Sequence, residues 1–346
     1  MKTEMMAAVL YGKEHLRVEP VAVPTIGEDD ILVRVKAALT CGTDVKVFLR
    51  GYHARMIIPP AVFGHELAGD VVEVGEGVTK FAIGERVVAA NSAPCGECYY
   101  CRHGRENLCD DLLFNNGAFA EYIRIPARIV KKNTYRVPDH VGYKDAALAE
   151  PLACVLRAVE ETRIRPGDTV AVIGLGPIGL MFVRMAKVGG ARVIALGRRQ
   201  AQLDRAVRMG ADDVVAVEEP ADAVRAVRGM TCGRGAEVAI EAVGTPVTWE
   251  MAAHMVRRGG TVNFFGGCSS DGRVTLETSL LHYSEITCKA SFHHTPAHIR
   301  RALQVISDGN VTAQDFVNNQ EPLENMLEVM RYLMSHNGHL KTAIIP

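Results

Sequence analysis

A glycine-rich turn between a predicted strand and a predicted helix most constrains how this chain can fold. Residues 169–173 form an apolar, branched segment, Gly174, Gly176 and Gly179 follow it, and a helical pattern continues to about residue 188. In a strand–turn–helix unit the first glycine permits the tight turn, the second lets the backbone approach a ligand, and the third lets helix and strand pack closely. The turn therefore predicts a βαβ unit.

The same alternation continues after this turn. Further strands are expected at 192–196, 213–217, 237–241 and 261–265, with helical stretches between them, one at about 201–209. Alternating strands and helices favour a parallel, doubly wound sheet with helices on both faces. Helices are also expected near 297–306 and 323–335, and a last strand at 341–345.

The first third of the chain has a different pattern. Short branched segments at 31–39, 67–74, 85–90 and 118–125 are separated by glycine-rich turns. This pattern is typical of a small barrel-like β-domain. A helix is expected over 146–163, ended by Pro166-Gly167. The length of 346 residues agrees with two domains.

Charge and composition exclude several functional classes. The formal net charge is −1, so no overall field favours nucleic acid or an anionic membrane. The segment Met1–Glu4 is not followed by a long apolar run, so neither a signal peptide nor a membrane span is expected. These features predict a cytoplasmic location, where nine cysteines are not a disulfide framework.

Four of the cysteines form a compact run. Cys95, Cys98, Cys101 and Cys109 fall within fifteen residues, in a loop that contains Pro94. One loop with these spacings can surround a tetrahedral metal ion, and four thiolates leave no open position, which predicts structural zinc. An iron–sulfur cluster, a redox dithiol and chance clustering are the alternatives. A zinc-ribbon nucleic-acid binder is disfavoured because basic and aromatic residues do not interleave here.

The glycine turn predicts a dinucleotide site. Its members are Gly174, Leu175, Gly176, Pro177, Ile178 and Gly179. A pyrophosphate would lie at the helix N-terminus, where free N–H groups and the helix dipole favour an anion. An ordinary tight turn is the alternative, but the flanking strand and helix favour the cofactor.

The end of the following strand bears on which cofactor binds. Sites that prefer NAD usually have Asp or Glu there, about 20 residues on, for the ribose hydroxyls. This chain has Gly197, Arg198 and Arg199 instead. Because the arginine fork matches a 2′-phosphate, we predict that NADP is preferred and that NAD is possible. A solvated basic helix start is the alternative.

A second group of potential metal ligands is spread along the chain. Cys41 follows a predicted strand, His65 and Glu66 precede another, and Glu150 and Cys154 open the helix before the glycine turn. Each residue alone is a weak signal. Together they offer thiolate, imidazole and carboxylate, a ligand set for a catalytic zinc that keeps one position open for substrate.

The ordered set of these motifs resembles the zinc-dependent medium-chain dehydrogenase/reductases, in their sorbitol, threonine and sugar-alcohol dehydrogenase branch. The matching motifs are Cys41-Gly-Thr-Asp44, Gly64-His-Glu66, the four-cysteine lobe, Gly117-Ala-Phe-Ala-Glu121, Glu150-Pro151 and Gly174–Gly179. The resemblance covers essentially the whole chain. It implies an α/β protein with a GroES-like catalytic domain at 1–152, completed by 295–346, and a Rossmann domain at 153–294.

The resemblance also implies roles for individual residues. Cys41 and His65 would bind the catalytic zinc, with Glu66 and Glu150 favoured as further ligands and Cys154 kept as an alternative. With the cysteine lobe this makes two zinc ions per subunit. Thr43 would pass the alcohol proton toward solvent. Zinc would act as a Lewis acid on the alcohol while hydride passes to C4 of the nicotinamide.

The expected substrate is a secondary alcohol, polyol or sugar alcohol, free or phosphorylated. Lys46 stands where related enzymes usually have a histidine, which disfavours the alternative of an L-threonine 3-dehydrogenase type. Lys46, Arg50, His53 and Arg55 form either a pocket for an anionic substrate or a solvated surface loop.

Two other classes remain as alternatives. A non-catalytic nucleotide-sensing protein would have broken zinc ligands, and a zinc-free quinone reductase would lack both metal sites. His282, His293 and His294 are interpreted as structural. A homo-oligomer, dimer or tetramer, is expected, with no nucleic-acid or membrane partner.

Overall fold

The computed structural model describes residues 2–53, 55–335 and 340–346. The chain divides into two compact units, one made of residues 1–153 and 294–346 and the other of residues 154–293. Helix α5 (Ala149–Thr162) begins in the first unit and ends in the second. Among the described residues, no helix combines the length and apolar character needed to cross a bilayer.

The strands of the first unit are β1 (Glu4–Gly12), β2 (His15–Ala22), β3 (Ile31–Leu39), β4 (Ala61–Val62), β5 (Glu66–Val74), β6 (Arg86–Ala89), β7 (Ser92–Ala93), β8 (Leu113–Phe114), β9 (Tyr122–Ile125), β10 (Thr134–Arg136), β17 (Val317–Pro322) and β18 (Lys341–Ile345). Its helices are α1 (Gly42–Arg50), α2 (Tyr99–Arg102), η1 (Glu106–Leu108), α3 (Ala127–Asn133), α4 (Tyr143–Ala146), α11 (Pro296–Ser307), α12 (Ala313–Phe316), η2 (Leu323–Asn325) and α13 (Met326–Met334).

The second unit contains the strands β11 (Thr169–Ile173), β12 (Arg192–Gly197), β13 (Asp213–Ala216), β14 (Ala236–Glu241), β15 (Val256–Phe264) and β16 (Thr287–Ala290). Its helices are α6 (Pro177–Val188), α7 (Gln200–Arg208), α8 (Pro220–Met230), α9 (Pro246–Met255) and α10 (Thr278–Tyr283).

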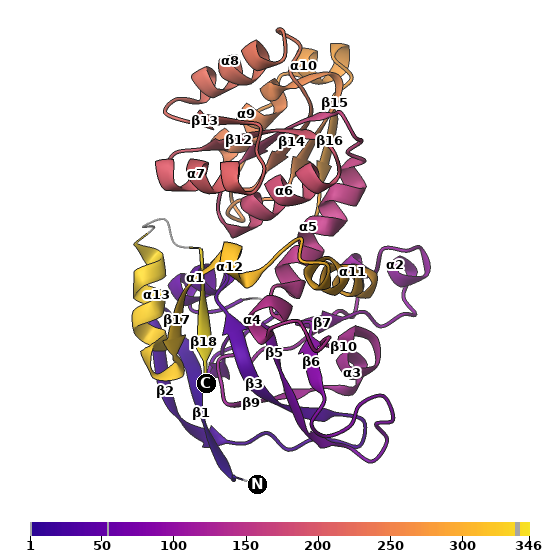
Figure 1. The fold of residues 1–346 in the computed structure, drawn as a ribbon, viewed down its shortest axis with the longest axis vertical. Coiled ribbons are helices and arrows are strands. Elements are labelled where there is room, and N and C mark those ends of the chain that lie inside the picture. Colours follow the sequence, from indigo (N-terminus) through magenta and orange to yellow (C-terminus); the bar gives the residue numbers. More distant parts are fainter. Residues whose placement is uncertain (1, 54, 336–339) are drawn as a thin grey trace. The chain divides into compact units, whose positions relative to one another are not determined.

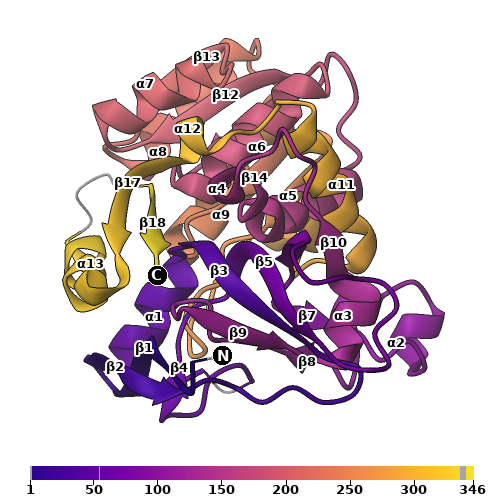
Figure 2. The ribbon, with the colours of Figure 1, turned by 60° about the horizontal axis from the view of Figure 1, so that its bottom comes forward.

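Strand β3 organises the main sheet of the first unit. The sheet order is β10-β6-β5-β3-β18-β17, and β9 also pairs with β3. Buried branched side chains such as Ile31 and Val33 pack into the core of this unit. The C-terminal strand β18 lies antiparallel to β3, with Ile344 opposite Ala38 (Figure 2). The last residues of the chain therefore complete a sheet that begins near its N-terminus.

Two features of the first unit differ from the sequence predictions. The strand expected over 118–125 is shorter and corresponds to β9, Tyr122–Ile125. The residues before Tyr122 make isolated backbone hydrogen bonds to other segments, such as Phe119 N–H to the Phe63 carbonyl at 2.9 Å. The helix expected over 146–163 is α5, which begins three residues later than expected, at Ala149, after the separate short helix α4. Pro151 lacks an N–H and suits only the first turn of a helix, so a new helix starts just before it.

The second unit has one parallel sheet. Its strand order is β13-β12-β11-β14-β15-β16, and each pair of neighbours in this order is parallel. Helices α6 and α7 cover one face, and α8 and α9 cover the other (Figure 1). The predicted class, a β-rich domain with a doubly wound parallel sheet, is confirmed. The order reverses direction between β11 and β14, which is where such sheets bind ligands.

Candidate functional site

The three potential ligands Cys41, His65 and Glu66 come together in the first unit. One ligand atom from each lies within 4.8 Å of the other two. Cys41 follows β3 and caps α1, while His65 and Glu66 stand at the start of β5. Because Leu39 lies opposite Glu66 in the β3–β5 register, the end of one strand meets the start of the other. Thr43 is half-buried beside them, with its backbone N–H 3.5 Å from Cys41 Sγ.

Asp44 orients this group. Its Oδ1 lies 3.0 Å from His65 Nδ1, and its Oδ2 accepts the Cys41 N–H at 2.8 Å. Burial disfavours the charged imidazole, but the carboxylate of Asp44 outweighs it and raises the pKa of His65. A histidine that donates Nδ1–H to a carboxylate keeps Nε2 for a metal, so this contact fixes the tautomer and the ring direction.

Glu66 is paired with a lysine from the far end of the chain. Lys341 Nζ lies 2.6 and 2.7 Å from the two carboxylate oxygens, and Glu66 is fully buried. Lys341 Nζ also donates to the Thr40 carbonyl at 3.1 Å. Burial raises the pKa of Glu66 to about 7, and the charge of Lys341 limits that rise. The carboxylate in turn overcomes burial and raises the pKa of Lys341.

Glu150 lies near the group without being a member of it. Its carboxylate is buried in the first turn of α5, and Oε1 is 3.6 Å from His294 Nε2. The same ring nitrogen lies 2.9 Å from Asn91 Oδ1. Burial raises the pKa of Glu150, while the charges of His65 and Lys341 oppose that rise. Cys154 follows one turn later on α5, in the second unit.

The four-cysteine lobe has the geometry of a tetrahedral metal site. All four sulfur atoms lie within 4.8 Å of one another. The Cys95–Cys101 and Cys98–Cys109 Sγ distances are both 3.9 Å, and the Cys95–Cys109 distance is 3.4 Å. Sulfur ligands about 2.3 Å from a tetrahedral zinc ion would be about 3.8 Å apart. The N–H groups of Glu97 and Cys98 donate to Cys95 Sγ and lower its pKa to about 6. These donors favour the thiolate at Cys95, whereas burial raises the pKa of Cys101 to about 12 and also raises that of Cys109.

The glycine turn of the second unit fits an anion. Gly174 has φ +92°, which favours glycine, and a Cβ on Gly179 would lie 1.7 Å from the Gly174 carbonyl oxygen. A Cβ on Gly176 would meet nothing within 4 Å, so the backbone is open there. No side chain caps the N-terminus of α6, and Pro177 occupies its first turn. Free backbone N–H groups therefore face the space where a pyrophosphate would bind.

The remaining predicted cofactor residues lie at the end of β12. Gly197 packs against Leu175, since a Cβ on this glycine would lie 2.8 Å from Leu175 Cδ1. Arg198 is exposed and Arg199 stands at the N-cap of α7. The two arginines thus lie beside the glycine turn, at the carboxyl ends of the parallel strands.

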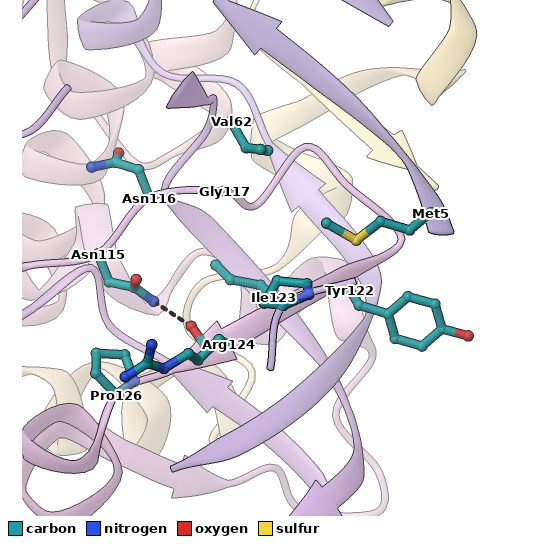
Figure 3. A pocket seen from close by; sticks show the side chains of 10 residues that line it. Met5, Val62, Asn115, Asn116, Gly117, Tyr122, Ile123, Arg124 and Pro126 are labelled. Atoms are coloured by element: carbon teal, nitrogen blue, oxygen red, sulfur yellow. Dashed lines mark hydrogen bonds between the residues drawn. The ribbon is translucent and has the colours of Figure 1, made fainter. Parts of the chain in front are cut away.

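A cavity of about 300 Å³ lies elsewhere in the first unit (Figure 3). Met5, Val62 and Ile123 form apolar parts of its wall, and Asn115 Nδ2 donates to the Arg124 carbonyl at 3.0 Å. None of the three clustered ligands lines it, so it has no part in the site described above.

Sequence reasoning missed Asp44, Lys341 and His294 as members of the site. Asp44 was visible only as part of a motif, and its contact with His65 depends on sheet register. Lys341 had a signal, because a lysine that starts an otherwise apolar strand needs a counter-charge if it is buried. His294 was interpreted as structural, and its contact with Glu150 joins segments far apart in sequence.

The buried ion pair leads to a prediction about stability. Replacing Lys341 with methionine leaves Glu66 buried without its partner, so we expect the metal-free chain to lose about 3–5 kcal/mol of unfolding free energy. The double variant K341M/E66L should recover most of that loss. Chemical denaturation followed by circular dichroism measures both.

Lys2 provides the matched control. It pairs with Glu121 at 3.1 Å on the surface, so Lys2→Met should cost about 0–1 kcal/mol. A loss for Lys341→Met no larger than that of the control would contradict the importance of the buried pair.

Comparison with known proteins agrees with this architecture. Residues 27–139 match the alcohol dehydrogenase GroES-like domain, and residues 177–308 match the zinc-binding dehydrogenase family. The sorbitol dehydrogenase of Bacillus subtilis (strain 168) is 32% identical, over 99% of this chain and 97% of its own length. An L-threonine 3-dehydrogenase of Bacillus licheniformis is 39% identical over 73% of each chain.

A solved structure extends the similarity. A zinc-binding dehydrogenase from Sinorhizobium meliloti 1021, bound to NADP, superposes with a TM-score of 0.89 at 30% identity, covering 100% of both chains. With these matches, the chain belongs to the zinc-dependent medium-chain dehydrogenase/reductase family, in its sorbitol dehydrogenase-like branch, and is an NAD(P)-linked alcohol oxidoreductase.

Proposed function

We propose that Cys41 and His65 hold a catalytic zinc ion, with a carboxylate from Glu66 or Glu150, and that the enzyme oxidises a polyol or sugar alcohol. The observation that carries this proposal is the cluster of thiolate, imidazole and carboxylate within 4.8 Å. The set of three protein ligands is the one that catalytic zinc sites use while keeping a position for substrate. Glu150 lies close enough to His65 for the charge of the imidazole to lower the pKa of its carboxyl group.

The bound zinc would supply Lewis-acid polarisation of the alcohol oxygen, and the nicotinamide would accept hydride. The residues of the chain supply the rest. Asp44 keeps His65 in the tautomer that presents Nε2, and Lys341 balances the charge of Glu66. Thr43 stands two residues after Cys41, so its hydroxyl is our candidate for accepting the alcohol proton and passing it toward solvent.

The cysteine lobe would hold a second, structural zinc. Its support is the near-tetrahedral spacing of four sulfur atoms and the N–H groups that stabilise Cys95 as a thiolate. Lys132 Nζ donates to the Cys95 carbonyl at 2.7 Å and fixes the start of the loop. Four thiolates close the coordination shell, so this ion takes no part in the chemistry.

Metal content tests both zinc sites. We expect two zinc ions per wild-type chain by mass spectrometry of the purified protein, and about one in Cys98→Ser and in Cys41→Ser, because each change removes a ligand from a different site. Cys154→Ser should keep two. One zinc in Cys154→Ser would instead make Cys154 a ligand of the catalytic ion.

We propose NADP as the preferred cofactor. Arg198 and Arg199 replace the acidic residue that would bind the ribose hydroxyls, and Gly197 brings the end of β12 against the glycine turn. The relative from Sinorhizobium meliloti 1021 was solved with NADP. An exposed guanidinium beside the turn would pair with the 2′-phosphate.

Arg198→Ala tests this preference. We expect the KM for NADP to rise by about 10-fold or more, since a charged hydrogen bond to phosphate is lost, while the KM for NAD changes less than about 2-fold. Arg208→Ala, at the C-terminal end of α7, is the matched control, since it removes an exposed arginine far from the start of that helix. A lower KM for NAD than for NADP in the wild type would refute the preference.

The substrate class rests on the relatives and on local charge. Sorbitol dehydrogenases and D-xylulose reductases from other organisms are similar over nearly the whole chain. Arg50 and Arg55 are exposed, and their charges act together with that of His65 to help burial lower the pKa of His53. These positive charges would favour binding of a phosphorylated substrate. A homo-oligomeric state stays a prediction.

A substrate panel tests the function itself. We expect turnover of polyols or sugar alcohols, with kcat/KM for a phosphorylated polyol about 10-fold above that of the free polyol, because the Arg50 and Arg55 cations would attract the phosphate. Double substitution of Arg50 and Arg55 with glutamine should remove this difference. Equal kcat/KM values for the free and the phosphorylated polyol would refute the preference for an anionic substrate. No turnover of any polyol would refute the substrate class.

A further inference from the structure

A fully buried carboxylate, Glu241, ends strand β14 in the second unit. Its Oε1 accepts the N–H groups of Val243 at 2.8 Å and Gly244 at 2.9 Å, and the hydroxyl of Thr248 at 2.7 Å. All three donors belong to the turn between β14 and α9 or to the first turn of α9. A buried carboxylate is tolerated only with such partners, so this one side chain fixes the course of the turn.

The main chain of Glu241 holds a second segment. Its carbonyl accepts the N–H groups of Phe265 at 3.0 Å and Gly266 at 2.9 Å, directly after β15. Gly244 has φ +85°, and a Cβ there would lie 2.6 Å from the Gly267 carbonyl oxygen. The turn after β14 and the segment after β15 are therefore fixed against each other, with little free space.

The same turn also packs against the glycine-rich turn. A Cβ on Gly174 would lie 2.5 Å from Val243 Cγ2, and the Ala242 N–H donates to the Ile173 carbonyl at 2.8 Å. Three loops at the carboxyl edge of the sheet thus meet around Glu241: those after β11, β14 and β15.

The strand order indicates which half of a dinucleotide lies over these loops. A dinucleotide spans the crevice where the order reverses, here between β11 and β14. The adenosine ribose is read at the end of β12, and the pyrophosphate lies at the N-terminus of α6. The second nucleotide, which carries the nicotinamide, therefore extends over the ends of β14 and β15.

We propose that Glu241 is a positioning residue for the nicotinamide half of the cofactor. It acts through the backbone of residues 242–245 and 265–267, which it holds in a fixed conformation beneath the nicotinamide nucleotide. It takes no part in proton or hydride transfer. This inference rests on the proposed cofactor site. It predicts that losing the carboxylate weakens binding of the whole dinucleotide and spares binding of its adenosine half.

The test is calorimetric titration of the intact zinc-loaded protein with NADPH and with 2′,5′-ADP, which lacks the nicotinamide nucleotide. Glu241→Ala should weaken NADPH binding by about 10- to 100-fold, because three donors lose their acceptor. The Kd of 2′,5′-ADP should change less than about 2-fold. Glu241→Gln keeps a carbonyl oxygen in the place of Oε1, so it should restore most of the NADPH affinity.

Glu237 is the matched control on the same strand. Its carboxylate also accepts a backbone N–H, that of Thr169 at 2.8 Å, but at the opposite end of the sheet. Glu237→Ala should lower the melting temperature without changing the ratio of the two dissociation constants. Thr248→Val, which removes a single donor, gives a few-fold selective loss if Glu241→Ala does not fold.

The outcomes distinguish the positioning role of Glu241 from the cofactor site itself. An equal loss for both ligands in Glu241→Ala, unchanged NADPH binding, or a selective loss in Glu237→Ala would overturn the role of Glu241. A well-folded wild type that binds neither NADPH nor NADH would instead overturn the cofactor site on which the inference rests.

Discussion

The ion pair between Lys341 and Glu66 is the interaction on which the three potential metal ligands of the first unit, Cys41, His65 and Glu66, depend. Glu66 is fully buried and Lys341 nearly so, and their contacts of 2.6 and 2.7 Å join residues 275 positions apart. A buried carboxylate without a partner costs several kcal/mol. The pair therefore makes the pairing of β18 with β3 a condition for placing Glu66 beside Cys41.

The same lysine links all three strands that build the group. It stands at the start of β18, it is bound to Glu66 at the start of β5, and it donates to the carbonyl of Thr40 just after β3. Thr342 N–H donates to Thr40 Oγ1 at 2.9 Å and adds a second contact at this point. The C-terminal strand is thus part of the site although it supplies no ligand.

What the sequence revealed depends on how local each feature is. The glycine turn and the alternation around it involve neighbouring residues, so β11 to β15 of the parallel sheet could be predicted. The edge strand β16 was missed, because its mostly exposed residues give no apolar pattern. The four cysteines of the lobe lie within fifteen residues, so their spacing was enough to predict that the four sulfur atoms lie close together.

Features that depend on distant contacts were missed or misplaced. The hairpin of β1 and β2 was not predicted, and β9 begins at Tyr122 because the preceding residues bridge to other segments. The partners of His65, Glu66 and Glu150 come from sheet register and from the C-terminal region, which no local pattern contains.

Charge balance relates the buried carboxylates around the potential metal ligands to a cation bound there. A Cys41 thiolate and the carboxylates of Glu66 and Asp44 carry three negative charges, and Lys341 removes one, so a divalent cation would make the group neutral. Without Lys341 the group would keep one negative charge, which would disfavour an oxygen ligand in its anionic form. Glu150, buried beside His294 and near His65, adds a further negative charge when ionised. In the proposed site, Lys341 would therefore increase the share of the cation's charge that acts on the substrate, and Glu150 would reduce it.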